Sequence, residues 1–328
     1  MIEEQLGRCV ASWYKGASGV TGAARLSGGA SQETWTFDII HAGGVTGAIL
    51  RRAPPGYGAS PGRACGLDAE AVLMQLAHDA GLPSPRVLHV LQPEDGLGAG
   101  FIMQRIEGET IARKILRDEQ FAKARPMLAR QLGQVAAGIH SLPALRLPKL
   151  REMNSTKEIA DLEREYHGFG RPRPVFELAL RWLRAHDPGP SRELTLVHGD
   201  FRHGNLVIGP DGVRAVLDWE LAHFGDPMED LGWLCVNSWR FGEIDKPVGG
   251  FGSREELFAG YEQAGRKVDP DRVKFWEVMG TLRWGVMCCG MMQRFRQGPD
   301  HSLERAMIGR RSSETEIDLL RLLAPREK

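Results

Sequence analysis

Residues 194–220 read LTLVHGDFRHGNLVIGPDGVRAVLDWE, a run in which short apolar segments alternate with polar ones. Three of the segments, Thr195–Val197, Leu206–Ile208 and Arg214–Leu217, are typical of short strands. The turn sequence Gly-Pro-Asp-Gly joins the last two strands into a hairpin. Polar residues follow the first strand and the hairpin, so we expect them to project from loops that a sheet holds in place.

Four of these polar residues stand in an order that suits phosphoryl transfer. Asp200 follows the first strand, Asn205 precedes the second, and Asp218 follows the hairpin. Phosphoryl transfer needs a carboxylate that receives a hydroxyl proton, and an amide and a carboxylate that hold Mg²⁺ on a nucleoside triphosphate. Arg202 can neutralise charge on the transferring group. Taken singly, each is an ordinary loop residue; the ordered set favours Asp200 as base and Asn205 and Asp218 as metal ligands.

A competing interpretation takes His198, Asp200 and His203 as an HxDxxH cluster, which would suggest a zinc or iron hydrolase. No distant glycine-flanked histidine pair accompanies the cluster, and the other histidines are scattered. We therefore expect His198 to brace the loop and His203 to point away from the base.

Composition sets broad limits on function. The 328 residues include 42 basic and 42 acidic ones, so net charge gives no reason to expect nucleic acid or an anionic membrane as partner. The N-terminus lacks the pattern of a signal peptide. The apolar run Phe275–Met292 contains Glu277 and Arg283, which argues against a membrane span. Five cysteines without a CxxC pair favour a cytoplasmic protein with reduced thiols.

The chain changes character after Gly108, from a β-rich first part to a helix-rich second part. Strands are expected at Trp35–Ile40, Gly47–Arg51, Val87–Leu91 and Gly100–Arg105, with a helix over Asp68–Ala80. Helical spacing of apolar residues marks Ile111–Ser141, Ser155–Tyr166, Pro174–His186 and most of the chain from Glu229 onward.

The run HGDFRHGN followed by LDWE resembles the aminoglycoside phosphotransferase and choline-kinase superfamily, which shares the protein-kinase fold. The resemblance is strongest to kinase-like domains found ahead of some acyl-CoA dehydrogenase domains and to their stand-alone bacterial relatives. It implies a bilobal α+β fold: a nucleotide-binding lobe over residues 1–105, and a helical lobe over residues 106–328 with the catalytic loop and acceptor site. It also implies ATP, or GTP, as co-substrate with Mg²⁺.

Weaker matches follow in the expected order. Gly28, Gly29 and Ser31 lie between two predicted strands, where the family has its phosphate-covering loop; an ordinary hairpin turn is the alternative. Arg51 occupies the place of the usual phosphate-binding lysine, and arginine can bind phosphate in a bidentate manner. By the same resemblance, Glu70 on the next helix pairs with that cation; an exposed helical glutamate is the alternative.

The segment FIMQRIEG at residues 101–108 resembles the hinge between the lobes. The resemblance implies that the carbonyl of Gln104 and the amide of Ile106 bind the adenine edge, and that Met103 lines the back of the pocket.

Two departures from protein-kinase motifs bear on regulation and on the class of acceptor. HGD replaces HRD, so the cation that would receive an activation-loop phosphate is missing. DWE replaces DFG, and no long activation segment follows, which favours a small-molecule acceptor over a protein. Asp226 and Asp230, a few residues on, are expected to brace loops.

The acceptor should bind between the catalytic loop and the late helices. Residues 240–300 hold ten Lys/Arg and nine Asp/Glu. This segment therefore lacks the acidic surplus that a polycationic aminoglycoside would favour. Arg283, Arg294 and Arg296 lie on or beside the apolar run and can meet a carboxylate or a CoA phosphate, although a solvated helix end explains the last two equally well. A hydroxy acid or its CoA ester is our leading expectation. Alternatives are an aminoglycoside or macrolide, choline held in a cage of Trp233, Trp239, Trp276 and Trp284, or a non-catalytic nucleotide-binding regulator.

Overall fold

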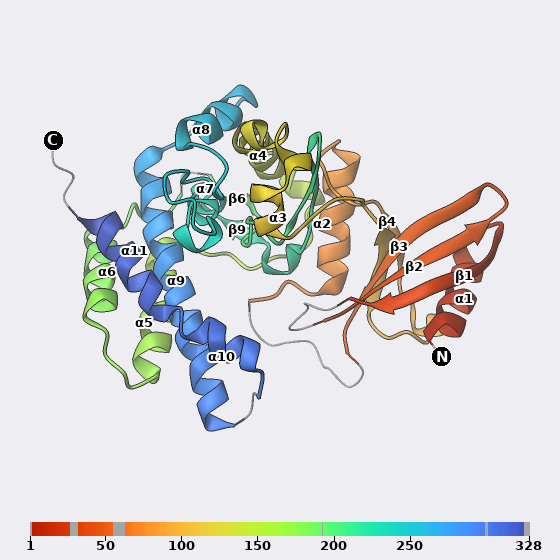
Figure 1. The fold of residues 1–328 in the computed structure, drawn as a ribbon, viewed down its shortest axis with the longest axis horizontal. Coiled ribbons are helices and arrows are strands. Elements are labelled where there is room, and N and C mark those ends of the chain that lie inside the picture. The colour runs from red at the N-terminus through yellow and green to blue at the C-terminus, as the bar shows by residue number, and fades with distance from the viewer. Residues whose placement is uncertain (1, 27–31, 55–62, 192, 299–300, 325–328) are drawn as a thin grey trace.

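The computed structural model describes residues 2–26, 32–54, 63–191, 193–298 and 301–324. Figure 1 shows two parts, an antiparallel sheet at one end and a larger helical body at the other. This is the bilobal α+β architecture that the sequence predicts. Within the described residues, no helix has the length and apolar character needed to cross a bilayer.

The sheet has five strands in the order β1-β2-β3-β5-β4, all pairing antiparallel. Its strands are β1 Ala17–Arg25, β2 Glu33–His41, β3 Gly44–Arg52, β4 Val87–Val90 and β5 Gly100–Gln104. A tight turn joins β2 to β3, where Gly44 adopts a φ of 124° that side chains disfavour. The four predicted strands of this part are confirmed, with ends that differ by a few residues.

One face of the sheet is covered by a helix that the sequence analysis did not assign, α1 at Ile2–Trp13. Its residues Leu6 and Val10 pack against Phe37 and Ile39, which alternate inward along β2. This small core fixes the N-terminal helix to the sheet.

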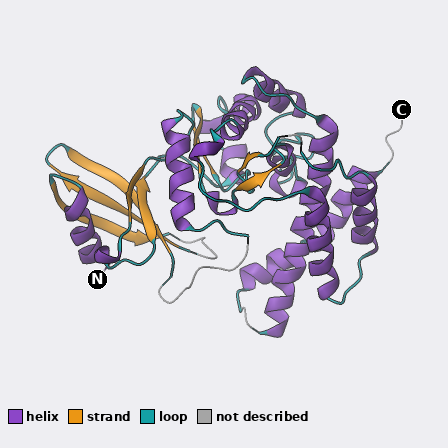
Figure 2. Cartoon of the chain, turned by 180° about the vertical axis from the view of Figure 1, so that it is seen from behind, coloured by secondary structure: helices purple, strands orange, loops and turns teal. Residues whose placement is uncertain are grey.

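The helix α2, Leu67–Asp79, lies between the strands and the helical body in both views (Figures 1 and 2). Its buried residues Leu73 and Met74 join one continuous core that includes Phe101 from β5 and Leu132 from the helical body. The two parts therefore share apolar packing through α2. We keep the division between residues 105 and 106 as a proposal.

The helical body is built around α9, Pro270–Gln297, which contacts α7, α10 and α11. Its other helices are α3 Ala112–Arg117, α4 Arg125–His140, α5 Ser155–Gly168, α6 Pro174–Ala185, α7 Met228–Leu234, α8 Arg254–Gln263, α10 Leu303–Gly309 and α11 Ser312–Leu323. Helical spacing suggested one stretch over 111–141, but the structure interrupts it, since α3 ends at Arg117 and Pro126 lies in the first turn of α4.

Two small sheets inside the helical body carry the motif that opened the sequence analysis. β6, Thr195–Val197, pairs with β9, His223–Gly225, and β7, Leu206–Gly209, pairs with β8, Gly212–Val216. All three predicted strands are confirmed. They are almost fully buried, so the loops between them are held rigidly.

Candidate active site

The carboxylate of Asp200 sits directly after β6 and is held by three side-chain donors. The Nε atom of Arg202 donates to its Oδ1 at 2.9 Å, and the indole Nε1 of Trp233 donates to the same oxygen at 2.8 Å. Asn205 Nδ2 donates to its Oδ2 at 2.6 Å and to its backbone carbonyl at 2.9 Å. These bonds fix the direction of the carboxylate. It remains partly exposed, which a general base needs in order to reach its substrate.

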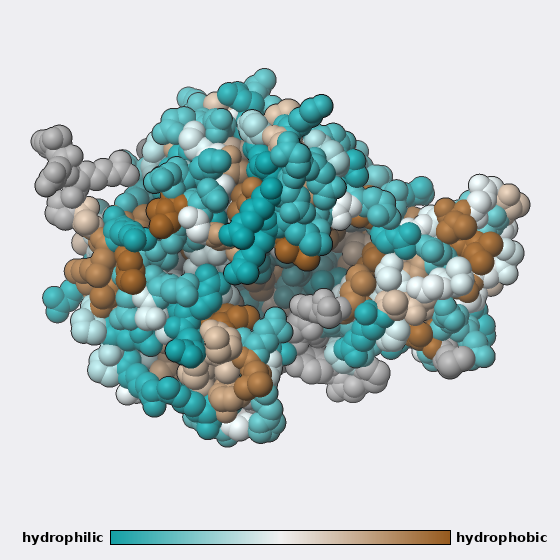
Figure 3. All heavy atoms as spheres, in the orientation of Figure 1, coloured by the Kyte–Doolittle hydropathy of each residue, from teal (hydrophilic) through white to brown (hydrophobic). Residues whose placement is uncertain are grey.

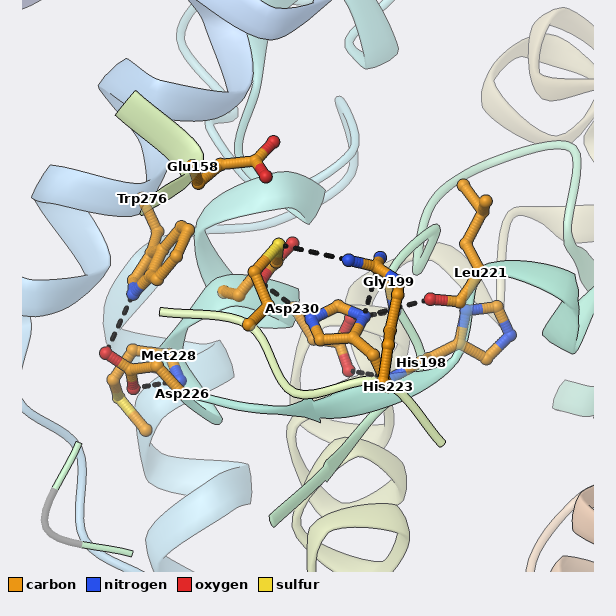
Figure 4. Close-up of polar contacts among 12 residues, drawn as sticks. Glu158, His198, Gly199, Leu221, His223, Asp226, Met228, Asp230 and Trp276 are labelled. Carbon is orange, nitrogen blue, oxygen red and sulfur yellow. Dashed lines mark hydrogen bonds and ion pairs between the residues drawn. The ribbon is translucent and has the colours of Figure 1, made fainter. Parts of the chain in front are cut away.

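Asp230, at the start of α7, braces the catalytic loop from below. Its carboxylate accepts the backbone N–H groups of His198 and Gly199 at 2.8 and 2.9 Å (Figure 4). His140 Nε2 lies 3.0 Å from the same carboxylate. Asp226 points elsewhere, toward Trp276 and the amide of Met228. Both aspartates therefore serve the structural role that the sequence analysis expects.

His198 is fully buried and holds the loop through both ring nitrogens. Its Nε2 lies 3.1 Å from the Leu217 carbonyl, and its Nδ1 accepts the Asp200 amide at 3.2 Å. Burial lowers the pKa of His198, which keeps the ring neutral and able to donate from one nitrogen while accepting at the other. The ring thus links the base to the residue before Asp218.

The two expected metal ligands lie on neighbouring segments. The Leu217 amide donates to the Asn205 carbonyl at 2.8 Å, which brings Asp218 next to Asn205. Asp218 has φ 65° and ψ 63°, a left-handed conformation that costs free energy outside glycine and is concentrated at functional sites. Because Asn205 uses its amide nitrogen on Asp200, its oxygen remains for a metal. An amide oxygen and a carboxylate suit Mg²⁺, so these residues fit that ion.

Arg51 on β3 connects the sheet to the helical body. Its Nε lies 3.1 Å from a Glu70 carboxylate oxygen, and its Nη2 reaches Asp218 at 2.5 Å and Glu220 at 3.4 Å. The Arg51–Glu70 pair implied by the resemblance is therefore formed, and Glu70 is buried rather than exposed. Burial raises the pKa of Glu70 from 4.5 to about 7, and the Arg51 guanidinium acts in the opposite direction.

The hinge segment leaves the sheet at the end of β5. Met103 is buried and pairs with Ile49 of β3. The amide of Arg105 donates to the carbonyl of Gly47 in β3. The amide of Gln104 donates to the carbonyl of Arg86, which lies on the opposite side of the strand. Since N–H and C=O of one residue in an antiparallel strand point the same way, the Gln104 carbonyl faces away from β3. Ile106 follows, and the adenine-binding roles remain proposals.

The glycine-rich segment with Gly28, Gly29 and Ser31 lies outside the described residues, and its phosphate-binding role stays a prediction. Gln32, the next described residue, directs its Nε2 toward Glu220 at 3.4 Å.

The hydrolase interpretation finds no support in the geometry. His198 Nε2 faces the Leu217 carbonyl, and His203 Nε2 faces the Gly249 carbonyl at 2.6 Å. Burial lowers the pKa of His203 to about 4. Over the part of the chain that the structure describes, His198, Asp200 and His203 do not bring their ligand atoms together as a metal site would require.

The tryptophans do not form a cage for a quaternary ammonium. The Trp239 ring meets Trp233 edge-on and Trp284 at a tilt, with ring centres 5.2 and 5.0 Å apart. Trp276 instead points toward Asp226. The Arg202 guanidinium already lies 4.5 Å from the Trp239 ring centre. The aromatic faces thus carry the protein's own cation.

Several contributors were not assigned from sequence. The sequence analysis considered Trp233 only as part of an aromatic cage for choline. No pattern of neighbouring residues indicated its hydrogen bond to Asp200. A buried ionic network behind it links Arg283 to Glu229 at 2.9 Å and to Glu158 at 3.2 Å, and Glu229 in turn to His223 at 3.1 Å. Its members come from α5, from residues 223–229 and from α9, so spacing along the chain does not reveal it. The expectation that Arg283 meets the acceptor is not supported, because two buried carboxylates already hold its guanidinium.

A sequence model of the phosphotransferase enzyme family matches residues 22–276. The chain belongs to the phosphotransferase enzyme family. Among curated relatives of this phosphotransferase, acyl-CoA dehydrogenase family member 10 of Mus musculus is 29% identical over 57% of this chain and 18% of its own length. A protein of Arabidopsis thaliana described as a probable acyl-CoA dehydrogenase is 27% identical over 85% of this chain and 37% of its own. The phosphotransferase thus spans a minor part of these relatives.

Solved structures show the same fold. A candidate aminoglycoside phosphotransferase of Ralstonia eutropha superimposes with a TM-score of 0.75, 21% identity and 97% coverage of both chains. A choline/ethanolamine kinase family protein of Mesorhizobium loti superimposes with a TM-score of 0.60 and 22% identity, over 99% of this chain and 96% of the other. The resemblance stated from the HGDFRHGN and LDWE motifs, and the fold it implies, are confirmed.

Proposed function

We propose that this phosphotransferase is a small-molecule kinase that moves the γ-phosphoryl group of ATP, or GTP, to an alcohol. The observation that carries the proposal is the site around Asp200, in which Asn205 and Asp218 lie beside the base and Arg51 meets Asp218 from the sheet. Family membership and neighbours solved with ADP or AMP-PNP support a nucleotide as co-substrate.

The chemistry assigns one task to each residue. Asp200 accepts the proton of the acceptor hydroxyl while that oxygen forms a bond to the γ-phosphorus and the bond to the β-γ bridging oxygen breaks, which releases ADP. Arg202 lies beside the base and neutralises charge on the transferring group. Arg51, held by Glu70, contacts the nucleotide phosphates. Asn205 and Asp218 would hold Mg²⁺, which neutralises phosphate charge when bound.

A cavity of about 730 Å³ beside the catalytic loop is the candidate acceptor site. Ser238 lines it, and the adjacent Trp239 carries Arg202 on its ring. Its charged lining residues are Arg113, Arg310, Arg311, Glu314 and Asp318. Glu314 is paired with Arg311. The three arginines outnumber the two carboxylates, so the lining has a surplus of positive charge. This supports an anionic acceptor over a polycationic one.

A second cavity of about 410 Å³ shares Arg310 and Ser313 with the first. It is lined by four arginines, Arg171, Arg173, Arg296 and Arg310, and by no acidic residue among those described. Apolar residues stand beside this cationic surface: Figure 3 shows hydrophobic residues over this region, and on α10 Leu303 and Met307 are 73% and 61% exposed. An extended acceptor with an acyl part and several anionic groups, such as a hydroxyacyl-CoA, suits this combination.

A panel of acceptors tests the proposal. We expect Mg²⁺-dependent ATP consumption with hydroxy acids or their CoA esters, and little with choline, aminoglycosides or macrolides. Asp200→Asn should abolish turnover while ATP binding, measured by calorimetry, stays near wild type. Unchanged turnover in Asp200→Asn would overturn the catalytic assignment. ATP binding without consumption of any acceptor would favour the non-catalytic regulator.

The anionic acceptor is tested separately. Arg113→Ala and Arg310→Ala should each raise the KM for the acceptor by roughly 10-fold, the loss of one charge-assisted contact, and leave the KM for ATP unchanged. Arg117→Ala is the matched control, because Arg117 is exposed on the same helix as Arg113 but lines neither cavity. Equal effects in all three variants would contradict the assigned acceptor site.

A further inference from the structure

A cluster of three metal-ligand side chains lies at the end of the molecule away from the catalytic loop. Cys9 comes from α1, His89 from β4 and Asp95 from the short 3-10 helix Pro93–Asp95. Their sulfur, nitrogen and oxygen atoms all lie within 4.8 Å of one another. In the described ranges, no other group of three or more such side chains meets this condition.

The surroundings already orient the three groups. His89 Nε2 lies 2.8 Å from Asp95 Oδ2, and the Gln92 amide donates to the same oxygen at 2.7 Å. The Trp13 ring stacks on the His89 ring at 5.1 Å with an interplanar angle of 8°. The Trp13 indole N–H is buried and lies next to the Cys9 thiol, with which it interacts. Such outer contacts are what hold metal ligands in place.

We propose that Cys9, His89 and Asp95 bind a Zn²⁺ ion, with water as a fourth ligand. A thiolate, an imidazole and a carboxylate together form a ligand set that suits zinc. Binding releases the Cys9 thiol proton to solvent. The proton that His89 Nε2 shares with Asp95 moves to Nδ1 of the ring, so that Nε2 and the carboxylate oxygen bind the metal in place of their hydrogen bond. The thiolate is a stronger acceptor than the thiol for the adjacent Trp13 N–H.

A nucleophilic Cys–His–Asp arrangement is the alternative use of these residues. Cys9 is only 2% exposed, so its thiol is closed to a substrate carbon or phosphorus atom. An inaccessible thiol is a poor nucleophile, whereas a small metal ion can be held by the three side chains from inside the core.

The location gives the ion a structural role. Cys9 belongs to the small core in which α1 packs on the sheet, together with Leu91 and Leu97 from the connection between β4 and β5. A metal at this point cross-links the N-terminal helix to that connection. Because the site lies outside the catalytic machinery, the inference is independent of the proposed kinase reaction.

The test uses the full chain. Metal analysis after dialysis against Zn²⁺ and then metal-free buffer should find one Zn²⁺ per chain, and Co²⁺ should give the thiolate charge-transfer band. EDTA should lower the melting temperature. Cys9→Ser and His89→Ala should lose stoichiometric zinc, and Trp13→Phe should weaken affinity by about 10-fold. Cys289→Ser, a half-buried cysteine outside the cluster, should keep it.

Circular dichroism and the response to Co²⁺ separate loss of the site from loss of the fold. If Cys9→Ser fails to fold, Asp95→Asn provides the same readout. Absence of stoichiometric zinc from the folded wild-type chain, or zinc retained at wild-type affinity by His89→Ala and Asp95→Asn, would overturn the proposal.

Discussion

At the scale of single residues, the site depends on carboxylates that other polar groups hold in place. Asp200 is oriented by three donors, and its loop rests on Asp230 through two backbone amides. The groups that surround the base therefore matter as much as the base itself, because phosphoryl transfer depends on positioning.

The first prediction concerns Asp230. In Asp230→Asn, one side-chain oxygen is replaced by an N–H₂ group that cannot accept from the loop amides. An unsatisfied buried donor costs about 1–3 kcal/mol, so we expect kcat to fall by roughly 10- to 100-fold. Steady-state kinetics of Asp230→Asn should be compared with Asp226→Asn, which weakens bonds to Trp276 and Met228 and an ion pair with Arg272 but none to the catalytic loop. Equal losses of kcat in both variants would argue against a specific brace.

The second prediction concerns pH and stability. Burial alone would raise the pKa of Glu229, but Arg283 and His223 lower it from 4.5 to about 2. The ionised carboxylate therefore stabilises the fold above pH 4.5, and this contribution is lost as pH falls toward 2. Glu229→Gln should lower the free energy of unfolding near neutral pH by about 3 kcal/mol.

Denaturant titrations between pH 7 and pH 3 measure both effects. The difference between wild type and Glu229→Gln should shrink as the solution is acidified below pH 4.5. A difference that stays constant with pH would show that the carboxylate charge is not the cause.

At the scale of elements, the helical body depends on close contact between α4 and α8. A methyl group added at Gly133 would lie 2.1 Å from the Leu257 carbonyl oxygen, and one at Gly260 would lie 2.0 Å from that of Arg130. The backbones meet at two reciprocal glycines, and neither helix can accept a side chain there without moving.

The third prediction follows from this contact. Gly133→Ala should lower the free energy of unfolding by about 1–3 kcal/mol, because overpacking outweighs the gain in helix propensity. Gly7→Ala on α1 is the matched control, since nothing lies within 4 Å of a methyl group there. It should leave stability unchanged or raise it. A stable Gly133→Ala would contradict the packing argument.

At the scale of the whole molecule, Arg51 joins the two parts. It reaches Asp218 across 167 residues of sequence while Glu70 of α2 holds its other side. The arginine can contact both acids from separate nitrogens, which a single lysine ammonium does less well.

The fourth prediction tests this link. Arg51→Ala should raise the KM for ATP and lower kcat, so that kcat/KM falls by roughly 100-fold. This fall corresponds to about 3 kcal/mol, the free energy of one buried contact with a charged group. Arg51→Lys should recover part of this loss. Arg52→Ala, which breaks the pair with Glu33 and a bond to the Leu97 carbonyl but no contact with Asp218, should keep kcat/KM near wild type. Comparable losses in Arg51→Ala and Arg52→Ala would remove Arg51 from the nucleotide site.

The sequence by itself determined the local features. Strand and helix periodicity, the order of Asp200, Asn205 and Asp218, and the bracing role of Asp230 were predictable because each depends on a few neighbouring residues or on a motif of fixed spacing. The interruption between α3 and α4 was missed, since apolar periodicity continued through it.

Only the tertiary structure decided which distant groups meet. The contact between Trp233 and Asp200, the ionic network of Arg283, the cationic cavities and the meeting of Cys9 with His89 all join separate segments. Such contacts depend on how the whole chain packs, and no local pattern of apolar or polar residues encodes the distance between two side chains that are far apart in sequence.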